Sequence, residues 1–267
     1  MMIDKKAKSN LLASIKDKDE RILMSSILDK AIKFERSNTL SFTNFLNLNE
    51  LYIAKKILDF FNVKYVVFSA NDYVEKKNIA FVPEYLDTER VFLEHVSCLK
   101  IEPFGNSKVL HRDYMGAIYS LGVRRELIGD IILDHAGAYF FCMKNMEEFF
   151  LMNLISVGKQ EVKVEPIDLM SDEVKNLSVS LIEKECMIPS FRVDALLSEV
   201  YCLSRRETKE KIIKGDLFIN DKNIFQPNTL IQKDDVISFK KCGKLRVGNE
   251  IRRTKSSNIV IKILKYN

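Results

Sequence analysis

Three neighbouring stretches decide the fold of the C-terminal part of this chain, FRVDALL at 191–197, SRRETKEKIIKG at 204–215 and LFIN at 217–220. The second stretch predicts a helix with well-defined ends. Ser204 is a favoured N-cap, Glu207 three residues later completes a capping box, and Gly215 stands where a left-handed residue ends many helices. A strand at 217–220, a polar break and a second strand at 236–239 then predict two short helices on a small hairpin sheet.

The helix predicted from the second stretch has two different faces. Thr208 and Ile212 are four residues apart and share a face that can pack against a core. Arg205 and Lys209 are also four residues apart and share another face, which Arg206 extends. One side of the helix can therefore pack while the other offers cations to a ligand.

Several anchors in this region resemble the S4-like RNA-binding domain of ribosomal proteins, tyrosyl-tRNA synthetases and pseudouridine synthases. They are Arg192, Asp194, Leu197, Ser204, Arg205, Ile212, Gly215, Ile219, Asn220, Asp235 and Ile237. The resemblance implies an RNA-binding module, from which two residues depart. Thr208 stands where a small Ala is common, so the core must accept a hydroxyl group. Lys211 stands where an apolar residue is common, and it either adds a cation to the RNA face or costs some packing.

Composition predicts a folded protein with an uneven charge distribution. The chain has 267 residues, of which 46% are hydrophobic and 30% charged, enough for two or three domains. Residues 190–267 hold 17 Lys and Arg against 9 Asp and Glu, a net charge of +8. Residues 1–189 hold 25 against 28, a net charge of −3. This asymmetry is the electrostatic footprint of a domain that contacts phosphates.

The sequence carries no signature of a metal site, a cofactor site or a membrane segment. The five cysteines are scattered without a Cys-x-x-Cys pair, and there are only three histidines, so metal-ligand spacing is absent. No apolar run reaches the roughly 18 residues of a membrane helix. No glycine-rich phosphate loop or nucleophile motif is present. We therefore expect a cytoplasmic protein with no cofactor, no metal and no membrane partner, and we expect it to be a monomer.

The expected fold class is α+β, beginning with an N-terminal α/β domain at residues 1–90. Apolar residues recur at helical spacing over 17–36 and 44–61. Short β-like runs follow at 64–68 and 79–82. We expect the aromatic residues of this domain to form its core.

Residues 91–168 predict a second domain with the element order β-α-β-β-α-β. The predicted strands and helices are, in chain order, a strand at 95–101, a helix at 112–121, strands at 128–133 and 138–143, a helix at 146–157 and a strand at 161–167. This order is typical of a split βαβ, ferredoxin-like or RRM-like sandwich.

The remaining residues are divided among a linker, the S4-like domain and a terminal hairpin. A helix predicted at 174–184 makes 169–188 a linker helix, and a proline closes it. The S4-like RNA-binding domain covers 189–242. Residues 243–267 add a C-terminal β-hairpin extension.

Two features of the central domain allow both a structural and a functional interpretation. The run at 138–141 supplies aromatic side chains without the basic-glycine-aromatic signature of a true RRM, which favours a core role. The pair Gly129–Asp130 fits a bulge, a close contact or a carboxylate that anchors backbone amides, and this scaffold role is favoured. For Arg124 and Arg125, which with His111 could form a secondary RNA-facing edge, the two interpretations are equally open.

Two segments carry a second resemblance, HRDYMGA at 111–117 and LGVRRELIGDI at 121–131. They are similar to the diagnostic core of the bacterial YlmH family, whose members join an N-terminal region, an RRM-like domain and a C-terminal S4-like domain in that order. The resemblance implies a non-catalytic RNA-binding protein that associates with the large ribosomal subunit. Its implied partners are rRNA and peptidyl-tRNA, in ribosome-associated quality control, with a link to cell division.

The enzymatic alternative is an rRNA-modifying enzyme of the pseudouridine synthase type, a class that often carries an S4-like domain. In that class the domain is usually N-terminal, and the Gly-Arg-Leu-Asp type of catalytic segment is missing here. The run GDIILD at 129–134 is not a convincing substitute. We therefore expect no enzymatic activity and assign no catalytic residue.

The candidate RNA-binding residues are cations of the S4-like domain and of the hairpin that follows: Arg192, Arg205, Arg206, Lys209, Lys211, Lys214, Lys222, Arg252, Arg253 and Lys255. Arg192 and Arg205 open the two predicted helices, so we expect them to meet on a common surface near backbone amides that favour anions. As exposed cations they should contribute less than about 0.5 kcal/mol to stability.

Overall fold

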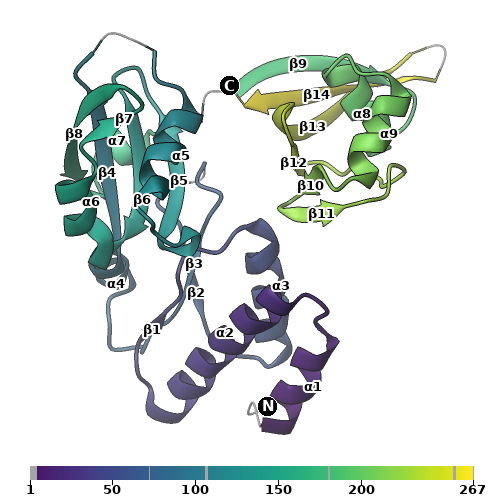
Figure 1. The fold of residues 1–267 in the computed structure, drawn as a ribbon. Helices are drawn as coiled ribbons and strands as arrows, with labels where there is room; N and C mark the ends of the chain where they lie inside the picture. Colours follow the sequence, from purple (N-terminus) through teal and green to yellow (C-terminus); the bar gives the residue numbers. More distant parts are fainter. Residues whose placement is uncertain (1–4, 72, 106–107, 180, 255–256, 267) are drawn as a thin grey trace. The chain divides into compact units, whose positions relative to one another are not determined.

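The computed structural model describes residues 5–71, 73–105, 108–179, 181–254 and 257–266. The chain divides into two compact units, Met1–Ser178 and Val179–Asn267 (Figure 1). The described residues form three sheets accompanied by helices, so the fold is mixed α+β, as the sequence predicts. Within the described ranges, no helix combines the length and the apolar character needed to cross a membrane.

The N-terminal part of the first unit packs three helices against a small antiparallel sheet. The first predicted helix begins as expected after Asp17, which accepts the N–H of Glu20. The second begins at Leu48, four residues later than predicted, because Asn47 forms a capping box with Glu50. The strand order is β1-β3-β2. The elements are α1 (Lys5–Ser14), α2 (Lys18–Ser37), β1 (Ser41–Phe42), α3 (Leu48–Phe60), β2 (Val66–Phe68) and β3 (Asn78–Phe81).

A helix that the sequence analysis did not predict, α4 (Thr88–His95), leads into the central sheet. It starts at Asp87, whose side chain accepts the N–H of Glu89 at 2.8 Å. His95, predicted to open a strand, is instead the last residue of α4, with Nδ1 2.7 Å from the Val91 carbonyl oxygen. The strand therefore begins one residue later than predicted.

The central part of the first unit is built around a five-stranded sheet with the order β5-β6-β4-β8-β7. The predicted alternation of strands and helices is found, with the small strand β7 added. Because β7 pairs with the start of β8, the preceding helix ends at Asn153 and does not reach the predicted residue 157. The elements are β4 (Val96–Pro103), α5 (His111–Ser120), the 3₁₀ turn η1 (Arg125–Leu127), β5 (Ile128–Leu133), β6 (Ala138–Met143), the 3₁₀ turn η2 (Lys144–Met146), α6 (Glu147–Asn153), β7 (Ser156–Val157) and β8 (Gln160–Ile167).

Both faces of the central sheet are covered along β6. Phe140 and Cys142 belong to the core that the sheet forms with α5 and α6, whereas Tyr139 and Phe141 belong to a second core on the opposite face. Residues outside the sheet close this second core, among them Phe45, Phe92, Leu169 and Val174. The aromatic residues of β6 are therefore core residues, as predicted, and they are not available to stack on RNA bases.

The pair Gly129–Asp130 attaches the N-terminal part to the central sheet. One extra residue in β5 opposite β6 makes a bulge here, and a Cβ on Gly129 would stand 2.9 Å from the Phe45 ring. Asp130 accepts the backbone N–H groups of Glu75 and Lys76 at 2.5 and 3.0 Å. Burial raises the pKa of this carboxyl group, and the two amides oppose that effect. The predicted scaffold role of Asp130 is thus confirmed.

The second unit is a six-stranded antiparallel sheet with the order β11-β10-β12-β13-β14-β9. Two short helices contribute Val193, Leu196, Leu197, Val200 and Ile212 to the core that they form with this sheet. The predicted terminal hairpin is present as β13 and β14, which continue the sheet. After β9 the elements are α8 (Val193–Val200), α9 (Arg205–Ile213), β10 (Leu217–Ile219), β11 (Lys222–Ile224), β12 (Val236–Phe239), β13 (Gly243–Arg253) and β14 (Ile259–Tyr266).

The helix predicted at 174–184 is wrong. The structure has one helical turn, α7 (Asp172–Lys175), and then the strand β9 (Leu181–Ile188), which pairs with β14 along its whole length. Cys186 and Ile188 are buried at alternate positions, which is the period of a strand. Because the pairing partner lies far along the chain, the local pattern between 174 and 184 did not reveal it. The residues predicted as the end of a linker are therefore an edge strand of the second unit.

Replacing Gly129 by Ala should destabilise the protein by about 1–3 kcal/mol, the usual cost of overpacking a core. The added Cβ would stand 2.8 Å from Phe141 Cβ and 2.9 Å from the Phe45 ring. Gly116 in α5 offers a matched control, because a Cβ there would meet no atom within 4 Å. Gly116→Ala should stabilise the protein by about 0.5–1 kcal/mol. Urea denaturation compares the variants, and equal stabilities would contradict the close packing at Gly129.

Candidate nucleic-acid interface

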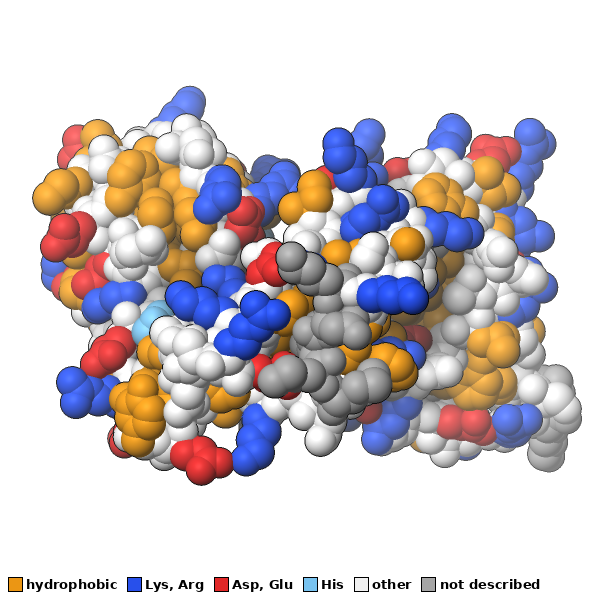
Figure 2. Space-filling model, turned by 90° about the horizontal axis from the view of Figure 1, so that it is seen from below, with side chains coloured by type: hydrophobic (Ala, Val, Ile, Leu, Met, Phe, Trp, Pro, Cys, Tyr) orange, Lys and Arg blue, Asp and Glu red, His pale blue; other side chains and the backbone are white. Residues whose placement is uncertain are grey.

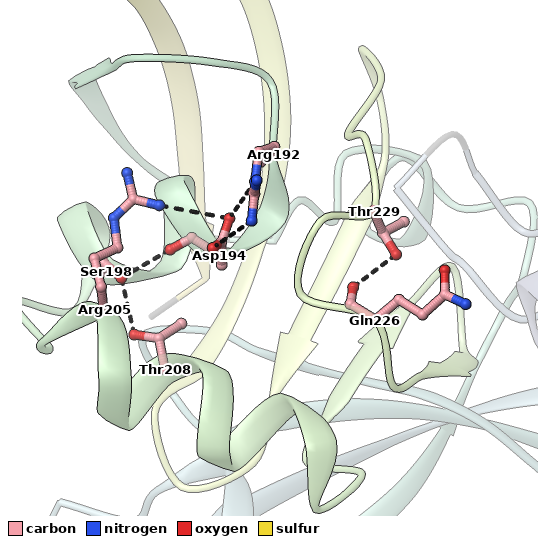
Figure 3. A network of polar contacts seen from close by, with 7 residues as sticks. All are labelled: Arg192, Asp194, Ser198, Arg205, Thr208, Gln226 and Thr229. Carbon is pink, nitrogen blue, oxygen red and sulfur yellow. Dashed lines mark hydrogen bonds and ion pairs between the residues drawn. The ribbon is translucent and has the colours of Figure 1, made fainter.

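A buried carboxylate holds the two arginines that open the helices of the second unit (Figure 3). Asp194 accepts a bidentate pair of hydrogen bonds from Arg192, with Nε and Nη2 each 3.0 Å from a carboxylate oxygen. Arg205 Nη1 lies 3.5 Å from the same carboxylate. The Asp194 side chain is 1% exposed, whereas the two arginine side chains are 41% and 46% exposed. The predicted meeting of Arg192 and Arg205 on a common surface is confirmed.

Two hydroxyl groups join α8 to α9 beneath these arginines. Thr208 is fully buried and donates to the Ser204 carbonyl oxygen at 3.0 Å. The Ser198 hydroxyl lies 2.9 Å from Thr208 Oγ1 and 2.7 Å from the Asp194 carbonyl oxygen, and it donates to one of them. The core therefore accepts the hydroxyl group of Thr208 by hydrogen bonding it, as a buried polar group requires.

The loop at 226–230 closes the start of α8. The Thr229 carbonyl oxygen accepts the N–H of Val193 at 2.9 Å, and the Pro227 carbonyl oxygen accepts the N–H of Asp194 at 3.2 Å. These are the amides that would otherwise face an anion at this helix end. The expectation that Arg192 lies beside anion-binding amides is therefore wrong for α8, because the protein's own loop occupies them.

Ser204 caps α9 as predicted, but the Glu207 side chain does not return a bond to the Ser204 N–H, so the predicted capping box is only half formed. Ser204 Oγ accepts the N–H of Glu207 at 3.1 Å. At the other end, Gly215 has a φ of +84°, and the N–H of Asp216 reaches back to the Lys211 carbonyl oxygen at 3.1 Å. These local bonds fix the direction of α9 and thereby the positions of its cations.

The other predicted cations differ in their partners. Arg206 pairs with Glu210 at 2.9 Å on the surface of α9. Lys209, Lys214 and Lys222 are exposed and make no ion pair with any described residue. These three lysines are thus the members of the predicted set best suited to meet an external phosphate.

Lys211 and the two hairpin arginines, unlike these three lysines, make ring or ion-pair contacts within the protein. The Lys211 ammonium group lies 6.0 Å from the Phe239 ring centroid, so this half-buried residue contributes to packing. Arg252 lies 3.6 Å from Glu185 and Arg253 2.9 Å from Glu250. Lys255 falls outside the described residues. In the view of Figure 2, lysines and arginines are spread among acidic and hydrophobic side chains and do not form one continuous patch.

The predicted secondary edge is divided by α5. His111 opens the helix, with Nε2 3.2 Å from the Ile131 carbonyl oxygen. Arg125 lies beyond the far end, with its guanidinium group 5.6 Å from the Tyr119 ring centroid. Arg124 is 3.3 Å from Glu126. Because a ten-residue helix is about 15 Å long, His111 and the two arginines lie at opposite ends of α5.

Sequence reasoning missed the role of Asp194 and the cations on the outer face of the second sheet. Asp194 is an anchor of the S4-like motif, but no local pattern shows that its carboxylate is buried between two arginines. Lys240 lies 5.2 Å from the Phe218 ring centroid and Lys244 lies 5.0 Å from that of Tyr266. The alternation along β12 and β13 is the signal that could have placed these lysines opposite the helices.

The described residues contain no metal-binding cluster of three or more His, Cys, Asp or Glu side chains. Cys98 and Cys142 are buried in the central sheet. Burial raises the pKa of the Cys98 thiol to about 12, and it raises the pKa of Cys142 as well. Both groups therefore stay protonated at neutral pH and behave as small apolar core residues.

Comparison with known proteins finds a matching family model, a similar sequence and similar structures. A family model described as "Putative RNA-binding domain in YlmH" matches residues 102–171, which lie in the first unit. The "Ribosome-associated protein quality control protein P2" of Bacillus subtilis (strain 168) is 23% identical over 243 residues, covering 89% of this chain and 93% of the relative. The "Cell division protein ylmH from Streptococcus pneumoniae" is 20% identical with a TM-score of 0.49, over 60% of this chain and 97% of that one.

Replacing Arg192 by Ala should destabilise the protein by about 1–3 kcal/mol, because the change removes two charge-assisted hydrogen bonds from a buried carboxylate. Lys209→Ala should change stability by less than about 0.5 kcal/mol, since that side chain is exposed. Chemical denaturation measures both variants.

The double variant Arg192→Ala and Asp194→Ala shows why the Arg192→Ala variant loses stability. If the cost comes from an unpaired buried carboxylate, the double variant should be destabilised by less than the sum of the two single changes. An Arg192→Ala variant as stable as Lys209→Ala would show that this ion pair does not support the fold.

Proposed function

We propose, since the chain belongs to the YlmH family, that it is a non-catalytic RNA-binding protein that associates with the ribosome. One observation carries this proposal, the pair of half-exposed guanidinium groups that buried Asp194 holds at the helix starts, near a helix with exposed lysines. Cations held in fixed positions suit a phosphate backbone better than mobile side chains do. The net charge of +8 over residues 190–267 supports the same ligand.

We further infer the module types from the order of elements. The strand order β5-β6-β4-β8 with α5 and α6 on one face supports an RRM-like domain, and the two helices on the second sheet support an S4-like domain. Because the faces of the central sheet are covered along β6, RNA contacts of the first unit would come from its edges. His111, Arg124 and Arg125 lie at such edges, within the stretch that the family model matches.

The proposed partners are rRNA and peptidyl-tRNA on the large ribosomal subunit. The name of the Bacillus relative refers to ribosome-associated quality control, and we carry that role to this chain as a proposal. Co-sedimentation with separated ribosomal subunits, followed by cross-link mapping of the bound RNA, tests it. Recovery of the chain free of both subunits would count against it.

An assay for uridine isomerisation on rRNA tests the enzymatic alternative. We expect no activity. Activity that is lost when a single carboxylate, such as Asp134, is replaced would overturn the non-catalytic proposal.

Removing two lysines should change how the RNA affinity of the full chain depends on salt. Each phosphate contact contributes about −0.7 to −0.9 to the slope of log affinity against log salt concentration. The double variant Lys209→Ala and Lys214→Ala should therefore have a slope flatter by roughly 1–2 units, with unchanged stability. Titrations by fluorescence anisotropy with an rRNA fragment measure it.

Two further double variants complete the salt titration. Lys33→Ala with Lys55→Ala removes two exposed cations from α2 and α3 and should leave the slope unchanged. Arg124→Ala with Arg125→Ala measures the contribution of the central domain. A slope that the Lys209 and Lys214 changes do not alter would refute a role for these lysines in phosphate binding.

A further inference from the structure

We propose that Phe225 is a base-stacking residue, on which an unpaired RNA base rests while Lys214 and Lys222 meet the adjoining phosphates. This inference rests on the proposed function and names the form of RNA that the second unit prefers. Phe225 is not among the residues that sequence reasoning selected. It follows β11, at the end of the β10–β11 hairpin.

The Phe225 ring is exposed where the other aromatic rings of the second unit are not. Phe225 is 58% exposed, whereas the other described aromatic residues of this unit are buried or half-buried. Phe239 is buried, and Tyr201 packs against the core. A single exposed ring is not unusual in itself, so the proposal depends on how this ring is held and what surrounds it.

The ring is held in place by the end of α9. A Cβ on Gly215 would stand 3.0 Å from Phe225 Cε1 and 3.6 Å from Cζ, so one edge of the ring rests on the glycine. Gly215 itself is fixed by its positive φ of +84°. The Asn223 side-chain amide donates to the carbonyl oxygens of Gly215 and Leu217 at 2.9 and 3.3 Å, which ties the hairpin to the helix end. A ring held by folded backbone loses little freedom when a base stacks on it.

Two exposed cations lie close to Phe225, one in the sequence and one beside the glycine that its ring touches. Lys214 precedes the glycine that the ring touches, and Lys222 opens β11 three residues before Phe225. Both side chains are exposed, and neither forms an ion pair with a described residue. An exposed ring in a segment that also carries exposed cations suits a flexible RNA strand, whose base can stack while its phosphates reach the cations. Along a base-paired duplex the bases present only their edges, so the ring could stack only on an end base pair.

The loop that follows Phe225 leads directly to the arginine pair. The Pro227 carbonyl oxygen, two residues later, accepts the N–H of Asp194 at 3.2 Å. Because two residues span at most about 7 Å, the backbone of Phe225 lies within roughly 10 Å of Asp194. One RNA strand can therefore reach the arginines and the ring with a span of about two nucleotides.

The test compares two RNA probes of equal length and charge with the full chain, a hairpin with an unpaired loop and a blunt duplex. Phe225→Ala and Phe225→Leu should weaken binding of the looped hairpin about 5- to 100-fold, the range for loss of one base–aromatic stack. Phe225→Tyr, which keeps the ring, should bind the hairpin within about twofold of the unchanged chain. Duplex affinity should change much less than hairpin affinity, because only the end base pairs of a duplex offer a face for stacking.

Ile213→Ala is the matched control, because Ile213 is 63% exposed beside the same glycine end of α9 and has no ring. It should bind both probes like the unchanged chain. Equal losses on hairpin and duplex, or a Phe225→Leu variant that binds the hairpin normally, would overturn the stacking role. If the unchanged chain binds neither probe, the proposed RNA-binding function fails together with it. If the unchanged chain binds both and Phe225→Ala loses nothing, only the stacking role fails.

Discussion

The carboxylate of Asp194 is the constraint on which the second unit depends. A carboxylate that is 1% exposed needs positive partners, because an unpaired charge in the interior costs several kcal/mol. Arg192 and Arg205 supply them from the starts of two different helices. The ion pair therefore sets how α8 and α9 meet, and it leaves one net positive charge at the surface. The two arginines are therefore needed for the stability of the second unit, whether or not they also bind a ligand.

This double role changes which cations can be varied without harm. Arg192 and Arg205 looked like exposed ligands for phosphate, but their removal leaves a buried acid without its partner. Lys209 in α9 and Lys222 in β11 are exposed and pair with no described acidic residue, so removing them leaves no buried charge unpaired. In this arrangement the arginines provide fixed positive charge, and the lysines provide charge that can adapt to a ligand.

In the first unit, burial decides which surfaces can act. The bulge at Gly129 allows Phe45 to approach the central sheet, and Asp130 anchors the backbone at Glu75 and Lys76. These contacts cover the face of the central sheet that carries Tyr139. They also join the N-terminal part of the unit to its central part. The face is used for packing, so helix ends and edges remain as the surfaces from which this unit can contact a partner.

The sequence by itself determined the features that depend on near neighbours. The cap at Ser204, the left-handed end at Gly215 and the strands of the central sheet follow from residues within a few positions of one another. The YlmH resemblance likewise rests on two short segments. Tertiary structure alone decided the rest, because the partners are far apart in the chain. The strand β9 forms only because β14 offers it an edge, the start of α8 is closed by a loop more than thirty residues later, and Asp194 is buried only where two helices meet. A local sequence pattern cannot predict such long-range contacts, because they form only when distant segments pack against each other in the folded chain.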